Sequence, residues 1–422
     1  MTLKEIRKTK GITQEQAARF LGVPIRTYKR YDSEEITKEN IKLNSLANSL
    51  QKYSKKPRKS HRFPKFDLTI IGAGFVGYNT GLVYSKRFDI TFVDKDENKV
   101  KDLKKNFKAV TSIKELTKID YALICLPTDY NEKTKTFNVK AIETAIKDIF
   151  RINKYATVII KSTVAIGYTE ALCHKFHKNI FVMPEFLREK HALEDVKRPV
   201  RVIVGAKTIT DKLLDFLKVQ QECLDIPQHA EIMEPYEAEM IKLYSNAYLA
   251  MRVTFFNEMD IKIRQLGLDS KKIINSLGKD ERIGNIYNDP SFGYSGYCLP
   301  KDVKVLQNQT GSELLKAVDS SNKKRKSDIA KEIVKTAKEI KEDPIVGFYG
   351  VDTTKQGKDY RISSTYEIYK KVKAHGITCI IFGENKTKSL NAFKEVCDLI
   401  VCNSNMPELK DVKYKVFTRS IK

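Results

Sequence analysis

The feature that most constrains the fold of this chain is a glycine-rich turn between a strand-like run and a helical stretch. Gly72-Ala-Gly-Phe-Val-Gly77 directly follows Leu68–Ile71. The next strand-like run, Ile90–Val93, leads to Asp94, which lies 22 residues after Gly72. A strand, a GxGxxG turn, a helix and then a carboxylate at this spacing are typical of a βαβ unit that binds a dinucleotide. We therefore predict such a unit at the start of an α/β domain.

Each part of this turn has a physical task. Gly72 permits a tight bend, Gly74 lets the backbone approach a pyrophosphate, and Gly77 allows the helix to pack closely on the strand. The N-terminus of the helix offers unpaired N–H groups to the phosphates. Asp94 is expected to accept hydrogen bonds from the adenosine ribose and to repel a 2′-phosphate. NAD is therefore the predicted cofactor, in preference to NADP.

Strand-like and helical segments alternate beyond this turn, which predicts a parallel, doubly wound sheet. Further strands are expected at Tyr121–Leu126, Thr157–Ile160, Phe181–Val182 and Val200–Val204. Pro235 suits the first position of a helix, and we expect that helix to continue to about residue 267 with an apolar face. A second, smaller α/β set is predicted from Pro344–Tyr349, Thr378–Phe382, Leu399–Val401 and Lys415–Phe417.

Positive charge is concentrated at the N-terminal end. Residues 1–65 hold 17 basic and 6 acidic side chains, a net +11 within a chain of formal charge +24. Such a concentration suits a polyanionic partner. The fold class predicted is two doubly wound α/β domains joined by a long central helix, with a small all-α N-terminal unit. The expected limits are 1–53 for the helical unit, 54–66 for a basic linker, 67–205 for the NAD-binding domain, 206–343 for the central helical part with Cys298, and 344–422 for the last α/β domain.

Cysteine usage and hydropathy bear on the compartment. The chain has seven scattered cysteines, which favour a reducing environment over a disulfide framework. No apolar run is long enough to span a bilayer, and no signal-peptide core follows the charged start. We expect a cytoplasmic protein, and because no Cys/His spacing is typical of zinc, we expect no metal.

Cys298 differs in its surroundings from the other six cysteines. It lies in Phe292-Gly-Tyr-Ser-Gly-Tyr-Cys-Leu-Pro-Lys-Asp302, where Gly293 and Gly296 let the backbone approach a ligand. Lys301 places a positive charge nearby, which is expected to lower the pKa of the thiol. Residue types alone leave two interpretations open, a reactive thiol and a small buried hydrophobe.

The segment from Asn288 to Asp302 resembles the active-site segment of the UDP-glucose/GDP-mannose dehydrogenase family, and is most similar to its UDP-glucose branch. Further segments agree with the family in the same order: Gly72–Gly77, Leu126–Thr128, Ser162–Gly167, Pro184–Glu189 and Lys242–Asn246. The resemblance extends from about residue 67 to the C-terminus. Three positions depart from the family pattern: Ser295 replaces a glycine, Ala165 a proline, and Lys190 a frequent glycine.

The resemblance implies a four-electron oxidation of a sugar C6 hydroxymethyl group to a carboxylate, with two NAD used in succession. Cys298 would trap the intermediate aldehyde as a thiohemiacetal, and the thioester formed next would be hydrolysed by water. UDP-glucose, giving UDP-glucuronate, is the expected substrate. A GDP-mannose or UDP-N-acetylhexosamine substrate is the alternative within the family.

The resemblance also implies roles for other side chains. Lys242 and Asn246, four residues apart on one helix face, would together stabilise an alkoxide. Asp302 would handle protons with Thr163 and a water, and Glu185 would assist thioester hydrolysis. Glu189 would lie near the nicotinamide, one helical turn from Glu185 if that segment is helical.

The expected binding residues complete the implied site. The cofactor contacts are Gly72, Gly74, Phe75, Val76, Gly77, Asp94, Lys99, Thr128, Thr163, Glu189 and Lys301. The substrate contacts are Glu185, Phe186, Leu187, Arg188, Lys242, Asn246, Arg282, Tyr287, Ser291, Gly296, Lys355, Arg361 and Arg419. Arg282 is expected to reach across from the other subunit of a homodimer formed through the long helix.

The N-terminal run Leu3–Val23 resembles the helix-turn-helix of phage-repressor-type DNA-binding domains. Thr13 would cap the second helix, and Ile25–Tyr31 would be the recognition helix. That helix would present Arg26, Thr27, Lys29 and Arg30 to DNA. The alternative is a helical appendage that serves assembly.

Two other functions are open to such a chain. One is a DNA-binding regulator whose dehydrogenase-like body only senses NAD or a sugar nucleotide; such a body would be expected to lose Cys298 or Lys242, and both are present. The other is a one-hydride hydroxyacid or phosphogluconate-type dehydrogenase, which needs neither the cysteine nor the last domain.

Overall fold

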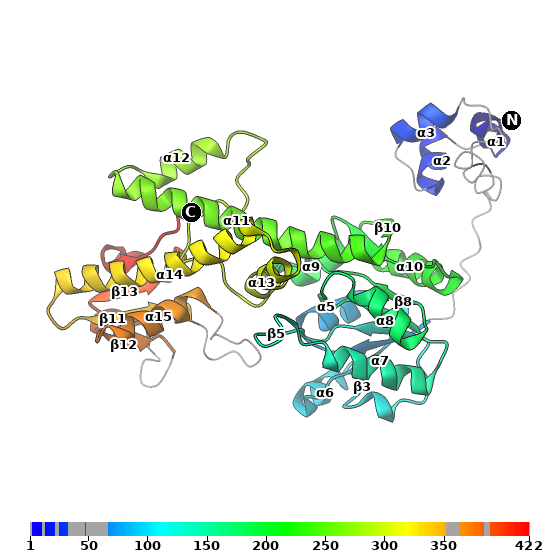
Figure 1. Cartoon of the computed structure of the whole chain (residues 1–422), viewed down its shortest axis with the longest axis horizontal. Coiled ribbons are helices and arrows are strands. Elements are labelled where there is room, and N and C mark those ends of the chain that lie inside the picture. The colour runs from blue at the N-terminus through cyan, green and yellow to red at the C-terminus, as the bar shows by residue number, and fades with distance from the viewer. Residues whose placement is uncertain are drawn as a thin grey trace.

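The structure is a computed structural model that describes residues 2–10, 13–21, 25–32, 47, 66–351, 363–383 and 389–421. The described residues of the N-terminal unit include the short helices α1 (Leu3–Thr9), α2 (Gln14–Leu21) and α3 (Ile25–Asp32), drawn in Figure 1. Its buried side chains include Leu3, Ala17 and Tyr28. The buried Asp32 carboxylate accepts hydrogen bonds from Arg7 (3.1 and 3.2 Å) and Gln14 (2.8 Å), so α3 is tied to α1 and α2.

An eight-stranded sheet forms the first α/β domain (Figure 1), in the order β10-β9-β8-β7-β4-β1-β2-β3. The strands are β1 (Phe66–Ile71), β2 (Phe88–Val93), β3 (Lys108–Val110), β4 (Tyr121–Ile124), β7 (Thr157–Ile160), β8 (Ile180–Val182), β9 (Val202–Gly205) and β10 (Ala230–Met233). The predicted strands are confirmed with small changes at their ends, and β3 and β10 are additions. The expectation of a fully parallel sheet is wrong at one place, because β8 pairs antiparallel to β9 through Val182 and Gly205. The segment 183–201 between these strands returns the chain in the opposite direction, which periodicity alone does not reveal.

Helices cover both faces of this sheet, as the doubly wound pattern requires. They are α5 (Phe75–Tyr84), α6 (Glu97–Leu103), α7 (Lys140–Ile152), α8 (Tyr168–Phe176), α9 (Ala192–Lys197) and α10 (Asp211–Cys223). The domain also has two short 3-10 helices, η1 (Ile113–Glu115) and η2 (Glu189–His191). A small hairpin consists of β5 (Tyr130–Asn131) and β6 (Thr136–Phe137). One buried cluster is aromatic and includes Phe88, Phe92 and Phe216. The other is aliphatic and includes Ile146 and Leu172. The two cores hold the strand ends in fixed positions.

The predicted central helix is α11 (Pro235–Gln265), followed by α12 (Ser270–Leu277), α13 (Cys298–Thr310) and α14 (Glu313–Ile340). Pro235 is its first residue, and Glu234 and Glu237 form a capping box around it. The helix runs from the large sheet to the second domain (Figure 1), and both α13 and α14 pack against it.

A four-stranded parallel sheet in the order β12-β11-β13-β14 forms the second α/β domain. Its elements are β11 (Ile345–Tyr349), α15 (Ser364–Ala374), β12 (Thr378–Ile381), α16 (Leu390–Val396), β13 (Leu399–Cys402), η4 (Pro407–Lys415) and β14 (Val416–Phe417). Phe292, from the segment before Cys298, is buried in its core beside Phe348 and Phe417. Among the described helices, none is both long and apolar enough to cross a membrane.

Candidate active site

The glycine turn joins β1 to α5 at the carboxyl edge of the large sheet. Gly72 has φ +94°, and a side chain there would meet the carbonyl oxygen of Cys125 at 2.6 Å. The Ala73 N–H donates to the Asp94 carboxylate at 2.9 Å. The ribose carboxylate predicted from spacing therefore lies directly beside the turn.

The turn also fits a dinucleotide sterically. A Cβ added to Gly77 would lie 1.9 Å from the carbonyl oxygen of Gly72, so this glycine is required by helix packing alone. A Cβ added to Gly74 would meet nothing within 4 Å, and Gly74 is the N-cap of α5. Open space at the first N–H groups of a helix is what a pyrophosphate needs. NAD thus fits the residues present, with Phe75 and Val76 at the first positions of α5 and Lys99 Nζ 3.4 Å from Asp94.

The loops after β4 and β7 meet beside this turn, where Gly72 faces the Cys125 carbonyl. The sheet extends in opposite directions from the adjacent strands β1 and β4, to β2 and β3 on one side and to β7 and beyond on the other. In doubly wound sheets, ligands bind at this switch point. The Thr128 hydroxyl donates to the Thr163 carbonyl at 2.7 Å. Ser162 donates to the Leu126 carbonyl, also at 2.7 Å. These bonds hold two of the predicted cofactor residues, Thr128 and Thr163, in one place.

A buried ion pair links the end of β8 to the long helix α11. Lys242 Nζ donates to a Glu185 carboxylate oxygen at 2.9 Å and to the Glu185 carbonyl at 2.7 Å. The second carboxylate oxygen accepts the Leu187 N–H at 2.7 Å. Burial opposes both charges, but the mutual attraction prevails: the pKa of Lys242 is raised and that of Glu185 is lowered. Both groups are therefore ionised.

A second buried cluster lies one turn along α11. Asp302 is fully buried, and its carboxylate accepts hydrogen bonds from Asn246 (2.5 Å) and Lys301 (2.8 Å). The Lys301 ammonium also lies over the rings of Phe137 (4.4 Å) and Tyr297 (4.9 Å). Lys242 and Asn246 thus occupy one helix face, as predicted, and each contacts a carboxylate from another element.

Cys298 is the first residue of α13 and is half-buried. Lys301 lowers the pKa of this thiol, as expected, but the net shift is upward. Burial, followed by the charge of Asp302, raises the pKa, and the opposing effects of Lys301 and Lys242 are smaller. Lys301 is paired with Asp302, which offsets the field of its charge at the sulfur. Cys298 is therefore a neutral thiol near pH 7, set among the charged groups of both clusters.

Several predicted residues lie elsewhere or have other partners. The segment 183–188 is not helical, so Glu189 is not one helical turn from Glu185; it lines a shallow pocket of about 360 Å³ with Phe75 and Asn79, on the cofactor side. The guanidinium of Arg188 is bound to Asp195 at 2.6 Å.

Some of the remaining residues predicted to contact the substrate also have other partners, and some lie outside the described residues. Arg282 is 89% exposed and binds Asp280, and Arg419 is buried in an ion pair with Glu332. Tyr287 (φ +58°) and Gly296 (φ +83°) have left-handed backbones in the loop before Cys298. Ser291 is occupied by bonds to Asn257 and Arg325, and Phe186 lies 5.5 Å from Lys242 Nζ. Lys355 and Arg361, the side chains of Arg26 and Thr27, and that of Lys190 lie outside the described residues.

Sequence reasoning missed three groups near the site. Lys161 is buried at the end of β7, and desolvation lowers its pKa although the charge of Glu185 is nearby. Arg201 stacks on Phe186 at 4.1 Å, and Phe137 faces Lys301 from the β5–β6 hairpin. A lysine at the carboxyl end of a fully apolar strand was a usable signal for Lys161; the two others depend on long-range packing.

Comparison with known proteins shows the family to which the chain is similar. Residues 102–218 match the NAD binding domain of the UDP-glucose/GDP-mannose dehydrogenase family, and residues 236–324 match its central domain. The chain is 37% identical over 395 residues to a UDP-glucose 6-dehydrogenase of Campylobacter jejuni subsp. jejuni serotype O:2, covering 84% of this chain and 98% of that relative. It is 32% identical over 396 residues to one of Streptococcus pneumoniae, with the same coverage.

A solved structure of a UDP-glucose dehydrogenase from Pyrobaculum islandicum shares the fold, with a TM-score of 0.73 at 23% identity over 86% of this chain and 95% of that one. The fold, the glycine turn and these relatives define an NAD-dependent dehydrogenase. More particularly, the chain belongs to the UDP-glucose/GDP-mannose dehydrogenase family.

Proposed function

We propose that this protein oxidises UDP-glucose to UDP-glucuronate in two NAD-dependent steps, with Cys298 as the covalent carrier between them. The observation that carries the proposal is the half-buried thiol between two buried ion clusters, Lys242–Glu185 and Lys301–Asp302. UDP-glucose is favoured over other nucleotide sugars because the two relatives at 37% and 32% identity carry that name. UDP-N-acetylmannosamine dehydrogenases of known structure share only 18% identity with this chain.

The first oxidation needs a proton acceptor and a donor to the developing alkoxide. Lys242 is ionised, so it donates N–H bonds to the sugar oxygen, and Asn246 is the second donor of the same helix face. Asp302 accepts the hydroxyl proton by way of a water that the Thr163 segment holds. The turn at Gly72–Gly77, Asp94 and Lys99 would hold NAD, which would supply the hydride acceptor.

The second oxidation passes through the cysteine. The Cys298 sulfur bonds to the aldehyde carbon, and the thiol proton moves to the carbonyl oxygen, giving a thiohemiacetal. Loss of a hydride to the second NAD and of the hydroxyl proton to water would then leave a thioester. Water adds to its carbonyl carbon, Glu185 takes a proton from that water, and the C–S bond breaks to give carboxylate and free thiol. Glu185 is ionised, as an acceptor of this proton must be.

The test is the yield of NADH per UDP-glucose consumed by the purified protein. Two NADH per sugar is the expected result. One NADH per sugar would indicate a one-hydride dehydrogenase, and no NADH would indicate a regulator that only senses its ligand. GDP-mannose and UDP-N-acetylmannosamine, assayed in parallel, should give at least tenfold lower kcat/KM. Cys298→Ser should bind NAD normally and release aldehyde instead of acid. Normal acid formation by Cys298→Ser would refute the covalent mechanism.

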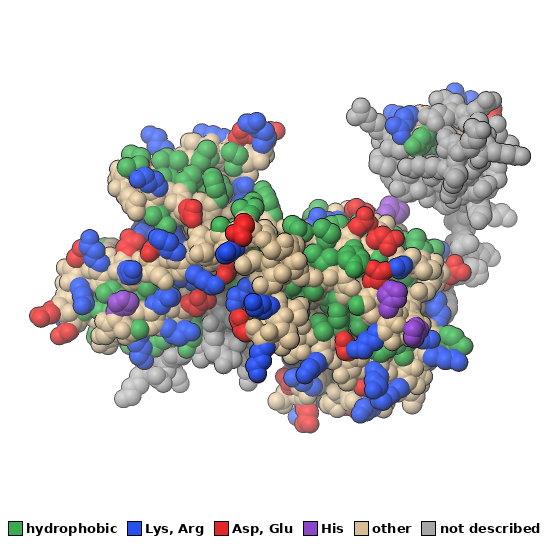
Figure 2. Space-filling model, viewed as in Figure 1, with side chains coloured by type: hydrophobic (Ala, Val, Ile, Leu, Met, Phe, Trp, Pro, Cys, Tyr) green, Lys and Arg blue, Asp and Glu red, His purple; other side chains and the backbone are tan. Residues whose placement is uncertain are grey.

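A homodimer is the second part of the proposal. Large apolar side chains that are 40–61% exposed recur along one side of α11: Tyr236, Met240, Tyr244, Tyr248 and Phe255. Apolar side chains also gather on the arm formed by α12 and the end of α11 (Figure 2). A stripe of this kind marks a protein interface, and the exposed Arg282 of the adjoining loop would enter the partner's substrate site.

The dimer is tested by sedimentation of Tyr248→Glu/Phe255→Glu, which should be monomeric and inactive. Leu214→Glu, at a similarly exposed position on α10, is the matched control and should behave as wild type. A double variant that keeps the wild-type mass would exclude this face as the interface.

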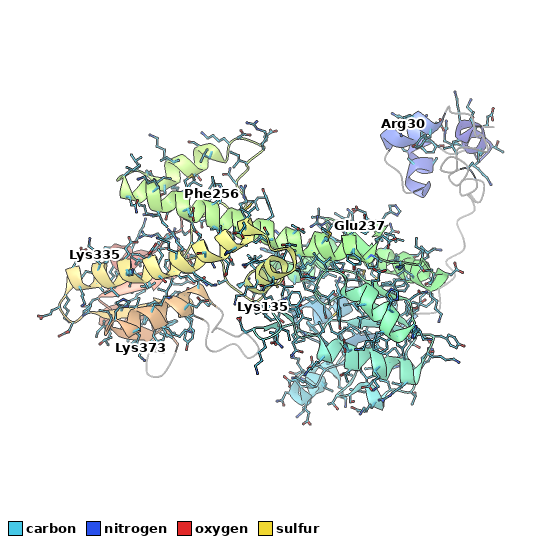
Figure 3. The ribbon with its side chains drawn as sticks, in the orientation of Figure 1. Arg30, Lys135, Glu237, Phe256, Lys335 and Lys373 are labelled. Carbon is cyan, nitrogen blue, oxygen red and sulfur yellow. The ribbon has the colours of Figure 1, made fainter. Side chains whose placement is uncertain are left out.

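DNA binding by residues 1–53 is the third part. Lys29 and Arg30 are exposed at the end of α3, where Figure 3 labels Arg30. Since 98% of the Campylobacter relative aligns with only 84% of this chain, about a sixth of the chain is additional. The net charge of +11 over residues 1–65 suits DNA. The seven free cysteines suit the cytoplasmic location in which both activities would occur.

A pool of 40-base-pair duplexes of random sequence, selected over several rounds, is the probe for this part. Full-length protein should select a sequence, Lys29→Gln/Arg30→Gln should not, and residues 54–422 should oxidise sugar normally. Lys4→Gln/Lys8→Gln removes the same charge from α1 and is the matched control. Equal losses in both variants, or selection by residues 54–422, would reject α3 as the recognition helix and leave residues 1–53 as an assembly appendage.

A further inference from the structure

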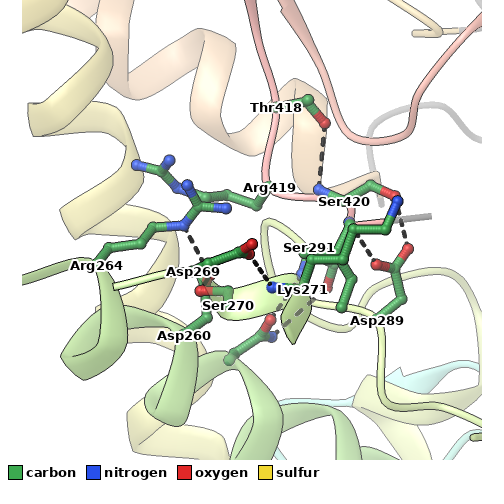
Figure 4. A network of polar contacts seen from close by, with 12 residues as sticks. Asp260, Arg264, Asp269, Ser270, Lys271, Asp289, Ser291, Thr418, Arg419 and Ser420 are labelled. Carbon is green, nitrogen blue, oxygen red and sulfur yellow. Dashed lines mark hydrogen bonds and ion pairs between the residues drawn. The ribbon is translucent and has the colours of Figure 1, made fainter. Parts of the chain in front are cut away.

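The segment that leads into Cys298 is bound to a series of different elements. It begins at Asp289, whose carboxylate accepts the Ser420 hydroxyl at 2.7 Å and the Ile421 N–H at 2.8 Å (Figure 4). Two residues later, the Ser291 N–H donates to the Asn257 side chain of α11 at 2.7 Å. The C-terminal end of the chain and the long helix therefore hold neighbouring residues of one loop.

The next three residues have further partners. The Phe292 N–H donates to Asn403, after β13, at 2.8 Å, and the Gly293 carbonyl accepts the Ser364 hydroxyl, at the start of α15, at 2.8 Å. The backbone of Tyr294 exchanges two hydrogen bonds with Asn322 of α14, at 2.9 and 3.1 Å. Residues 289–294, which we name the clasp, are thus fixed at nearly every position.

The α11–α14 side of the clasp is anchored firmly. Arg325 of α14 donates to the Ser291 carbonyl at 3.0 Å and to Asp260 of α11 at 2.9 Å. Asp260 is fully buried and also binds Arg264 (2.7 Å) and Ser270 (2.8 Å), as Figure 4 shows in part. These contacts make α11, α12 and α14 one frame.

The other side of the clasp consists of the second α/β domain, through Ser364, Asn403 and the terminal residues Ser420 and Ile421. Beyond the clasp, Gly296 has φ +83° with open space around it, and Cys298 begins α13 two residues later. The position of the Cys298 sulfur therefore depends on the position in space of the last residues of the clasp.

We propose that the second α/β domain positions Cys298 through this clasp, with Asp289, Ser364 and Asn403 as positioning residues. The domain then has a task besides the substrate contacts expected at Lys355, Arg361 and Arg419: the last residues of the chain hold the loop that carries the thiol. The chemistry affected rests on the proposed function, but the reactivity of the thiol is measurable without any substrate.

Two full-length variants test the proposal. Asp289→Ala removes the acceptor for Ser420 and Ile421, and Ser364→Ala removes one buried hydroxyl with little change of volume. The readouts are the rate of Cys298 alkylation by iodoacetamide, followed by peptide mass spectrometry, the NADH yield per sugar, and the thermal midpoint. Asp411→Ala is the matched control, because Asp411 lies in the same domain and binds Lys394 at an exposed position.

Both variants should form acid about tenfold more slowly, with a several-fold change in the alkylation rate, because a displaced reacting group loses its alignment. The first NADH should form at the wild-type rate, so the yield per sugar should fall towards one. Ser420→Thr, which keeps the hydroxyl, should retain wild-type rates.

Wild-type alkylation and acid formation in both variants would overturn the proposal. So would an equal change in Asp411→Ala, or a change that only follows a lowered thermal midpoint. If the wild-type protein does not oxidise UDP-glucose at all, the proposed function fails, while the alkylation rates still decide whether the clasp positions Cys298.

Discussion

Replacing Gly77 by alanine should disturb the packing of the domain core and, through it, the cofactor site. The added Cβ would lie 1.9 Å from the carbonyl oxygen of Gly72, and real Cβ contacts do not fall below 3.0 Å. Helix α5 must therefore move by more than 1 Å from β1, because its neighbour is backbone and cannot rotate away. Overpacking of this kind costs about 3 kcal/mol. For a domain of this size, the thermal midpoint should fall by about 6–12 °C.

Gly74→Ala is the matched control, because the same methyl group is added three residues earlier in the same turn. Nothing lies within 4 Å of that Cβ, and the backbone (φ −74°, ψ −166°) suits alanine. The loss at an N-cap position should stay below about 1 kcal/mol. NAD affinity should still fall by about tenfold, or about 1.4 kcal/mol, because the methyl group occupies the approach of the pyrophosphate.

Differential scanning calorimetry and titration calorimetry with NAD measure the two effects independently. Gly77→Ala should lose both stability and NAD binding, whereas Gly74→Ala should lose NAD binding alone. A Gly77→Ala protein with the wild-type midpoint would refute the packing argument. A Gly74→Ala protein that binds NAD normally would refute the placement of the pyrophosphate.

Three other predictions concern the site. Lys242→Met leaves Glu185 buried without its partner and should destabilise the protein by about 3–5 kcal/mol in urea unfolding, with most of the loss recovered by Lys242→Met/Glu185→Leu; a single variant as stable as wild type would contradict the buried pair. Asp302→Asn removes a charge that raises the pKa of Cys298, so the pH profile of alkylation should move to lower pH. A profile that stays in place or moves to higher pH would contradict the effect of Asp302 on the thiol. Arg282→Ala changes an exposed side chain and should leave the free energy of unfolding within about 0.5 kcal/mol of wild type while raising KM for the nucleotide sugar; a wild-type KM would exclude the proposed role of Arg282.

Local features of the fold could be predicted from the sequence. The glycine turn, its flanking strands and the start of α11 at Pro235 depend on short-range sterics, so spacing alone located them. The antiparallel β8–β9 pair could not be found in this way, since a strand reads the same in either direction. The direction is decided by the path of residues 183–201, which is set by tertiary packing.

The site shows the same division between local and long-range effects. Lys242 and Asn246 were placed on one face because helix geometry is local. The net shift of the Cys298 pKa was not predicted: Lys301, three residues on, lowers this pKa, but burial and the charge of Asp302 have larger effects in the opposite direction. Burial, the largest cause of the shift, is a property of the assembled fold. It could not be predicted from the sequence of residues 292–302 alone.

The raised pKa of Cys298 agrees with the order of the proposed chemistry, in which the cysteine acts after the first hydride has left. A thiolate at rest would be a third negative charge beside Glu185 and Asp302, and it would react with any electrophile that entered. A neutral thiol carries the proton that the aldehyde oxygen needs, so addition to the carbonyl requires no separate acid. Lys242, held ionised by Glu185, then stabilises the oxygen that was the carbonyl.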